Sequence, residues 1–412
     1  MHFAHSYPTP VRLLKLGMIG ALALLAGCSS LATSHAPSIP QGPAGDAFYA
    51  PPTPLPAGQH GDLIWARQLS NDAALPDAAA NWLVLYRSTD IQGKPVAVSG
   101  TVAIPKGTPP KGGWPVISWT HGTTGIADIC APSRDDSNYP ARGYVNLMND
   151  TLDQWLQRGY AIVKTDYQGL GTPGVHPYLV GESEARGAVD IVLAARQLDP
   201  DLSRNWLVMG HSQGGQAAVY TAYLGPIYGQ SLNLTGAIAI SPASHMSQQF
   251  RYAEKHLDLP TSAYGTMVMY STAALAPGVD LAKIYNEQGM KWNDQVPHRC
   301  VGDLRNNLKL KDVFKPDANF SALNSALASF ADTENVLPSV PLLVLQADND
   351  EAVYKQLTDM MVNRFKVLGL DVDYRTYHIA DKGSIATNHQ ATVPFSRQDA
   401  MSWAEQRLPS GR

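Results

Sequence analysis

The chain has 412 residues, of which 44% are hydrophobic and 16% charged, and its formal net charge is −4 at pH 7. This composition is typical of a globular protein and excludes both a disordered chain and a membrane-embedded one. There is no basic run that would indicate nucleic acid binding, and the length allows one large α/β domain with an inserted subdomain, or two domains.

Residues 1–27 have the features of an export signal. Arg12 and Lys15 precede an apolar stretch, residues 16–26, that is too short to span a hydrocarbon core of about 30 Å as a helix. The stretch ends in Leu25-Ala26-Gly27-Cys28, which resembles the lipobox of bacterial lipoproteins. That resemblance implies that Cys28 is lipidated and becomes the mature N-terminus, and that Ser29 permits sorting to the outer membrane. The alternative is an ordinary secretory signal.

The remaining cysteines are consistent with export. Without Cys28 the chain has Cys130 and Cys300, an even number for an oxidising compartment. We predict a disulfide between them, and the alternative is two buried thiols.

Residues 28–58 are rich in Pro, Ala, Ser and Gly and predict a tether between the lipid anchor and a folded domain. Beyond about Trp82, short apolar runs are separated by amphipathic stretches, which predicts an α/β fold with a mostly parallel sheet and helices on both faces. Strands are expected at 96–104, 115–119, 159–163, 206–209, 237–240, 341–345 and 372–376, and helices at 182–198, 213–224, 353–368 and 396–408.

Residues 244–335 interrupt this rhythm with many aromatic and methionine side chains and several prolines. We predict a mainly helical cap here, inserted after a sheet strand into an α/β domain made of residues 59–243 and 336–412. The alternative is a run of connecting helices that covers nothing.

The run Gly210-His211-Ser212-Gln213-Gly214 has the Gly-x-Ser-x-Gly pattern, in which a serine occupies a sharp turn between a strand and a helix. The pattern alone is weakly specific. Here, however, a predicted strand precedes it and a predicted helix follows it, and the glycines omit side chains where the two approach. We therefore predict that Ser212 is a nucleophile rather than part of a structural turn.

Acyl transfer by a serine needs backbone donors for the developing oxyanion. The expected donors are the amide of Gln213, directly after the nucleophile, and one amide from a loop after an earlier strand. The glycine-rich run His121–Gly125 follows the strand at 115–119. We nominate the amide of Thr123 as the second donor.

A serine nucleophile also needs a histidine base that a carboxylate orients, and the expected chain order is serine, acid, histidine. Asp348 and Asp350 both follow the apolar run 341–345, and we favour Asp350 because it lies closer to the next helix. For the base we favour His389, expected in a polar loop before the closing helix, over His378 at the end of the last strand.

These motifs together resemble the secretory lipase family of α/β-hydrolases, the lipase A-like group, over roughly residues 80–408. The resemblance implies an α/β-hydrolase fold, a cap over the active site, a triad of Ser212, Asp350 and His389, and hydrolysis of acyl esters. The cap region matches least, so the resemblance implies no acyl-chain length. The matching stretches are His121–Gly125, Cys130–Ser133, Thr165–Gly171, Gly210–Gly215, Asp350–Val353 and the surroundings of His389.

The resulting hypothesis is a serine hydrolase that cleaves carboxylic esters or lipids through an acyl-enzyme. We expect no metal and no organic cofactor, because no Cys/His cluster has ligand spacing. The expected partners are an acyl ester or lipid substrate and a membrane, contacted through the N-terminal anchor, and the chain is expected to be a monomer. The alternatives are a peptidase or acyltransferase with the same residues, and a non-catalytic surface lipoprotein on a hydrolase scaffold.

Overall fold

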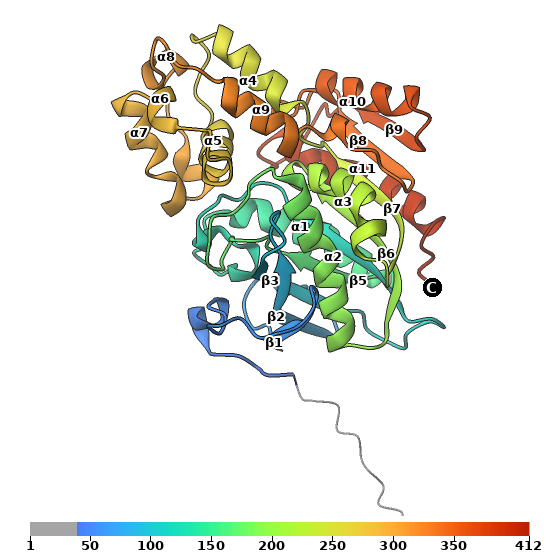
Figure 1. The fold of residues 1–412 in the computed structure, drawn as a ribbon. Helices are drawn as coiled ribbons and strands as arrows, with labels where there is room; N and C mark the ends of the chain where they lie inside the picture. The colour runs from blue at the N-terminus through green and yellow to red at the C-terminus, as the bar shows by residue number, and fades with distance from the viewer. Residues whose placement is uncertain (1–38, 412) are drawn as a thin grey trace, which may run out of the picture. The chain divides into compact units, whose positions relative to one another are not determined.

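A computed structural model describes residues 39–411 (Figure 1). The predicted signal peptide and Cys28 therefore lie outside the described residues. Within residues 39–411, no helix is both long and apolar enough to cross a membrane.

A nine-stranded sheet forms the centre of the folded unit, with the strand order β1-β2-β3-β5-β4-β6-β7-β8-β9. The first three strands form an antiparallel edge, and the other six run parallel to one another. This arrangement confirms the predicted mostly parallel sheet. The strands are β1 (Leu63–Gln68), β2 (Ala80–Thr89), β3 (Pro95–Ile104), β4 (Trp114–Thr120), β5 (Ala161–Thr165), β6 (Leu202–His211), β7 (Asn233–Ile240), β8 (Leu342–Ala347) and β9 (Val372–Tyr377).

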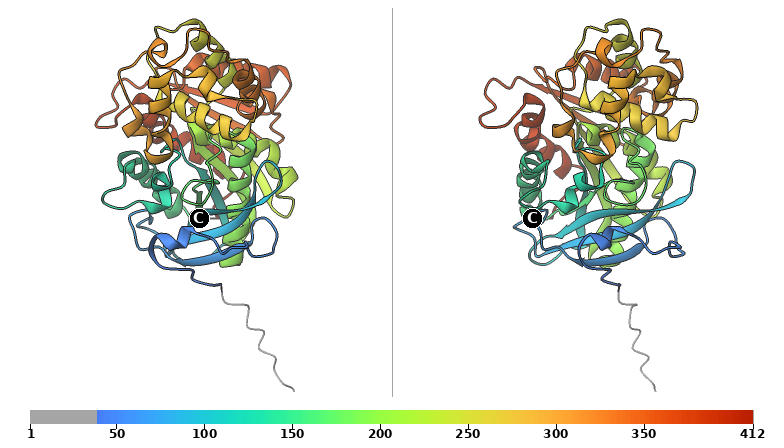
Figure 2. Two further views of the ribbon diagram at one scale, coloured as in Figure 1. Left: turned by 60° about the vertical axis from the view of Figure 1, so that its left-hand side comes forward. Right: turned by 90° about the vertical axis from the view of Figure 1, so that its left-hand side faces the viewer.

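Helices cover both faces of the sheet, so its central strands read as continuous apolar runs. One face packs against α2 (Gly181–Leu198), α3 (Gln213–Tyr228) and α10 (Lys355–Val367). The other face packs against α1 (Arg142–Gln157) and α11 (Asn388–Glu405), and the right-hand view of Figure 2 separates the two layers. Amphipathic spacing explains the packing of α1, which buries Val145, Met148, Leu152 and Trp155.

The predicted mainly helical insertion is present between β7 and β8, and it appears in yellow and orange in Figure 1. It has a hydrophobic core of its own, which also includes Tyr178 and Leu179 from the segment before α2. Ser212 follows β6, and the insertion follows β7, which is the neighbouring strand in the sheet. Its helices are α4 (Met246–Lys255), α5 (Ala263–Leu275), α6 (Leu281–Ile284), α7 (Glu287–Asn293), α8 (Leu310–Val313) and α9 (Ser321–Phe330).

The sequence predicts a tether that extends to residue 58, whereas residues 39–58 belong to the folded unit. Phe48 and Tyr49 are buried, and the Trp65 indole Nε1 donates a hydrogen bond to the Phe48 carbonyl at 3.0 Å. An aromatic side chain buries a large apolar area, so two of them hold a Pro-rich segment against the first strand. The overall composition of residues 28–58 gave no sign of these two buried aromatic side chains. The predicted tether therefore extends too far at its C-terminal end.

Candidate active site

Ser212 lies at a sharp turn between β6 and α3, with φ 60° and ψ −117°. Such a backbone conformation is uncommon for a residue with a side chain. A hydrogen bond from the Ser212 amide to the Ile240 carbonyl, 2.9 Å long, stabilises it here. A Cβ at Gly210 would lie 2.0 Å from Thr120 Oγ1, and one at Gly214 would lie 1.8 Å from the Thr120 carbonyl oxygen. The two glycines are therefore required by the close approach of strand and helix.

His389 and Asp350 form a buried pair. His389 Nδ1 lies 2.8 Å from Asp350 Oδ2, and the two side chains are 8% and 0% exposed. The other oxygen of Asp350 accepts hydrogen bonds from the amides of Ala352 at 2.9 Å and Val353 at 2.8 Å. Burial by itself raises the pKa of Asp350, but the hydrogen bonds from His389 and these amides bring the pKa below its ordinary value. The carboxylate is thus held ionised against the imidazole.

Asp348 and His378, the alternatives from the sequence, pair with each other instead. Asp348 Oδ1 lies 2.8 Å from His378 Nδ1, and both side chains are exposed, at 43% and 67%. This pair lies at the surface. Of the two aspartates after β8, only Asp350 contacts His389.

His389 lies in the first turn of α11, which begins at Asn388, whereas the sequence predicts it in a loop. The Thr387 side chain caps this helix by accepting a hydrogen bond from the Gln390 amide at 3.1 Å. The helix continues through Pro394 and begins eight residues before the predicted start at Ser396. The loop prediction is wrong, and the histidine is presented by a capped helix.

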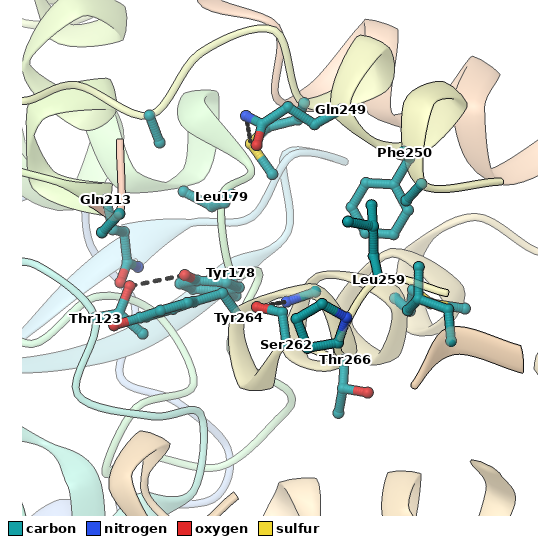
Figure 3. Close-up of a pocket in the computed structure, with 18 of the residues that line it drawn as sticks. Thr123, Tyr178, Leu179, Gln213, Gln249, Phe250, Leu259, Ser262, Tyr264 and Thr266 are labelled. Carbon is teal, nitrogen blue, oxygen red and sulfur yellow. Dashed lines mark hydrogen bonds between the residues drawn. The ribbon is translucent and has the colours of Figure 1, made fainter. Parts of the chain in front are cut away.

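Two cavities of about 240 Å³ each meet at Ser212. The first extends under the insertion and is lined mainly by apolar side chains such as Met246, Phe250 and Phe320. Figure 3 shows Thr123 and Gln213 at one end of this cavity and Phe250 and Leu259 at the other. The second cavity also includes His389, together with His211, Tyr144 and Arg305.

Thr123 and Gln213, the predicted oxyanion donors, both line the first cavity with Ser212. Gln213 is the first residue of α3, so its amide has no partner within the helix and lies at the positive end of the helix dipole. The Thr123 hydroxyl is 2.7 Å from the Tyr178 hydroxyl, a contact visible in Figure 3. The structure thus brings both residues to the cavity that Ser212 lines.

Tyr144, which the sequence analysis missed, connects the Gly122 amide to the His211 side chain through hydrogen bonds. The Gly122 amide donates to the Tyr144 hydroxyl at 2.7 Å, and this hydroxyl lies 3.1 Å from His211 Nδ1. The His389 carbonyl, 3.1 Å from His211 Nε2, only accepts, so in the neutral ring Nε2 carries the hydrogen and Nδ1 accepts from Tyr144. Burial lowers the pKa of His211 well below its ordinary value, so His211 stays neutral. No local motif marks Tyr144, because its partners are distant in sequence.

The predicted disulfide is present and joins the insertion to the loop after β4. The Cys130–Cys300 bond has a Cα–Cα distance of 5.6 Å and links residues 170 positions apart. Next to it, the Val301 amide donates to the Thr124 carbonyl at 2.9 Å. The loop that contains Thr123 is therefore tied to the insertion both covalently and by a hydrogen bond.

Comparison with known proteins gives consistent matches. The sequence model of the family described as secretory lipase matches residues 145–411. A probable inactive lipase of Mycobacterium tuberculosis is 22% identical, over 89% of this chain and 82% of that protein. Lipase A of Arthroderma benhamiae is 23% identical, over 89% of this chain and 80% of that protein.

Solved structures show the same fold. Candida antarctica lipase A in its closed state matches with a TM-score of 0.69 and 20% identity, over 81% of this chain and 80% of that one. A ligand-bound form of the rice cell wall degrading esterase LipA from Xanthomonas oryzae matches with a TM-score of 0.64 and 19% identity, over 85% of this chain and 99% of that one. The chain therefore has the α/β-hydrolase fold that the sequence predicts.

Proposed function

This chain belongs to the secretory lipase family, and we propose that it is a serine hydrolase of carboxylic esters with Ser212, His389 and Asp350 as its catalytic residues. The observation that carries the proposal is the buried His389–Asp350 hydrogen bond at 2.8 Å, beside a cavity that His389 shares with Ser212. A neutral imidazole oriented in this way is the base that a serine hydroxyl requires.

The reaction runs through an acyl-enzyme. His389 accepts the hydroxyl proton of Ser212 while Ser212 Oγ attacks the ester carbonyl, and the amides of Thr123 and Gln213 donate hydrogen bonds to the oxyanion. His389 then gives its proton to the leaving alcohol as the bond between the carbonyl carbon and the alcohol oxygen breaks. Water, deprotonated by His389, attacks the acyl-enzyme and releases the acid and Ser212.

The two cavities take the two halves of the ester. The alcohol oxygen receives its proton from His389, so the alcohol occupies the second cavity, which His389 lines. The acyl chain then occupies the first cavity, whose lining under the insertion is mainly apolar. Each methylene group of the acyl chain that is buried in this cavity contributes about 0.8 kcal/mol to the binding free energy.

This assignment is tested with 4-nitrophenyl esters of increasing acyl length. We expect kcat/KM to rise about fourfold for each added methylene until the cavity is filled, since about 0.8 kcal/mol corresponds to that ratio. Gly265 lines the cavity, and a Cβ there makes only ordinary contacts, 3.6 Å from Ser262 Cβ and 3.9 Å from Phe250 Cζ. Gly265→Leu should therefore lower kcat/KM for long esters and leave the acetate unchanged. A loss that is equal for all chain lengths would contradict the assignment.

We also propose that the chain is a lipoprotein of the bacterial cell envelope, anchored through Cys28 and sorted to the outer membrane. The support is the sequence Leu25-Ala26-Gly27-Cys28 after a short apolar stretch. In a bacterial host, the full-length chain should fractionate with outer membranes, and Cys28→Ala should abolish labelling by a radioactive fatty acid. Labelling that persists in Cys28→Ala, or an unlabelled wild type that is secreted, would exclude the anchor.

A further inference from the structure

The side chain of Gln213 is part of a buried polar cluster. Gln213 Nε2 lies 2.8 Å from Glu184 Oε1 and 3.0 Å from His176 Nε2. Glu184 and His176 are fully buried, and Gln213 is 1% exposed. Gln213, whose backbone amide is a proposed oxyanion donor, is thus held through its side chain by groups outside the proposed triad.

The hydrogen-bond directions in this cluster are determined. His176 Nδ1 lies 2.9 Å from the Gln168 carbonyl, which only accepts, so Nδ1 carries the hydrogen and Nε2 is an acceptor. The two amide hydrogens of Gln213 are then both used, one to His176 and one to Glu184. Burial lowers the pKa of His176 to about 3, so this imidazole carries no charge at neutral pH.

Glu184 forms no ion pair with any residue in the described part of the chain. Its Oε1 also accepts from the Leu179 amide at 3.1 Å, while its Oε2 has no hydrogen-bond partner within residues 39–411. Arg186, two residues further along the same helix, pairs with Glu182 instead. An ionised carboxylate here would be buried without a cation, which is costly. Burial accordingly raises the pKa of Glu184 to about 8, although the hydrogen bonds from Gln213 and Leu179 favour ionisation.

The other titratable groups that face Glu184 are neutral or acidic. They are His176, the phenols of Tyr167 and Tyr178 before α2, and that of Tyr220 on α3, with Asp332 and Glu334 beyond Tyr220. Burial raises the pKa of all three phenols. None of these groups supplies a positive charge that would favour ionised Glu184.

Residues 176–184 also contact Thr123, the second predicted oxyanion donor, and the insertion. The Tyr178 hydroxyl contacts the Thr123 hydroxyl at 2.7 Å, and the Tyr178 amide donates to Ser271 Oγ at 2.8 Å. Ser271, on α5, donates in turn to the His176 carbonyl at 2.9 Å. Residues 176–184 therefore connect both predicted oxyanion donors to each other and to the insertion.

We propose that Glu184 is a positioning residue that, as a neutral acid, holds Gln213 in place for oxyanion binding, and that its ionisation inhibits the reaction. The inference rests on the proposed function. Neutral Glu184 fixes the Gln213 side chain and so the amide at the start of α3. Ionised Glu184 would place a negative charge one glutamine side chain away from the oxyanion, in a dry environment where repulsion is strong.

The test compares kcat and KM between pH 6 and 9.5 for 4-nitrophenyl butyrate, after subtraction of spontaneous hydrolysis. In the wild type, kcat should fall by about tenfold per pH unit above pH 8 if the ionised form is inactive, with KM unchanged. Glu184→Gln keeps an oxygen acceptor for Gln213 and Leu179 and cannot ionise, so this alkaline decrease should disappear. Glu184→Ala removes the acceptor and should lower kcat about tenfold at every pH. Thermal unfolding checks that each variant is folded.

Glu182→Gln is the matched control, because it makes the same substitution on the same helix at an exposed position and should retain the alkaline decrease. The proposal is overturned if Glu184→Gln loses kcat above pH 8 as the wild type does. In that case another group, such as Lys164, whose pKa burial lowers to about 8, would account for the decrease. It is also overturned if Glu184→Gln and Glu184→Ala lower kcat equally. Failure of the proposed function is distinct, since no hydrolysis dependent on Ser212 would then occur at any pH.

Discussion

Ser212→Ala should lower kcat for a short 4-nitrophenyl ester by a factor of about 10⁵ to 10⁶, the range found when a hydrolase loses its serine nucleophile. The reason is that no acyl-enzyme can form without Ser212 Oγ, while the cavities and the predicted oxyanion donors remain. The measurement is the initial rate of nitrophenol release with a purified enzyme at concentrations that span several orders of magnitude.

A fluorophosphonate probe supplies the independent readout. It should label the wild type at Ser212, as located by peptide mass analysis, and should leave Ser212→Ala unlabelled. Alanine adopts the φ of 60° at this position less readily than glycine, so Ser212→Gly is a useful second variant if Ser212→Ala unfolds early. Wild-type rates in either folded variant would remove Ser212 from the mechanism. An unlabelled, inactive wild type would favour a non-catalytic hydrolase scaffold.

Asp350→Asn should lower kcat by about 10⁴-fold with the fold intact, in line with the same change in a serine protease. The carboxylate accepts a hydrogen bond from His389 Nδ1 at 2.8 Å and so leaves Nε2 as the base. An amide at this position offers a donor as well as an acceptor, and permits the opposite tautomer, in which the base is lost. The measurement is kcat for the same ester from pH 5 to 9.

Asp348→Asn is the matched control, two residues away on the same loop. Its partner His378 is exposed, so the change should alter kcat by less than about twofold, as expected for a surface ion pair. A collapse of kcat in Asp348→Asn but not in Asp350→Asn would reassign the acid.

The lowered pKa of Asp350 adds a dependence of stability on pH. A carboxyl group whose pKa is lower in the folded than in the unfolded state stabilises the fold above its unfolded pKa, here 3.8. This contribution is lost as the pH falls through the folded pKa. Asp350→Asn should therefore lack this part of the acid-induced loss of stability of the wild type, measured as the midpoint of thermal unfolding below pH 4.

The insertion is attached to the candidate site by a disulfide and by hydrogen bonds, in addition to its two chain connections. The Cys130–Cys300 disulfide ties one side of it to the loop of Thr123, and Ser271 ties α5 to the segment that supports Gln213. The first cavity is lined both by Ser212 and by residues of the insertion. We therefore expect changes in the insertion to affect kcat as well as substrate preference.

The local pattern of the sequence was sufficient to predict seven of the nine strands, four of the helices that cover the sheet and the sharp turn at Ser212, but not β1, β2 or α1. Buried parallel strands are continuous apolar runs, and glycines 210 and 214 are needed because any side chain there would collide with Thr120. The disulfide was predicted from cysteine number and compartment. Each of these features depends on residues that are close together in the chain or on a count.

The sequence favoured Asp350 over Asp348 by position alone, and the tertiary structure adds that Asp350 contacts His389 whereas Asp348 pairs with His378. It also placed His389 in the first turn of α11, a helix that Thr387 caps and that begins eight residues before the predicted start at Ser396. Glu184 looks like an ordinary acidic residue in the first turn of a helix, and Tyr144 like an ordinary core aromatic. Their partners, Gln213 and His211, are distant in sequence, and the fold alone brings them within hydrogen-bonding distance.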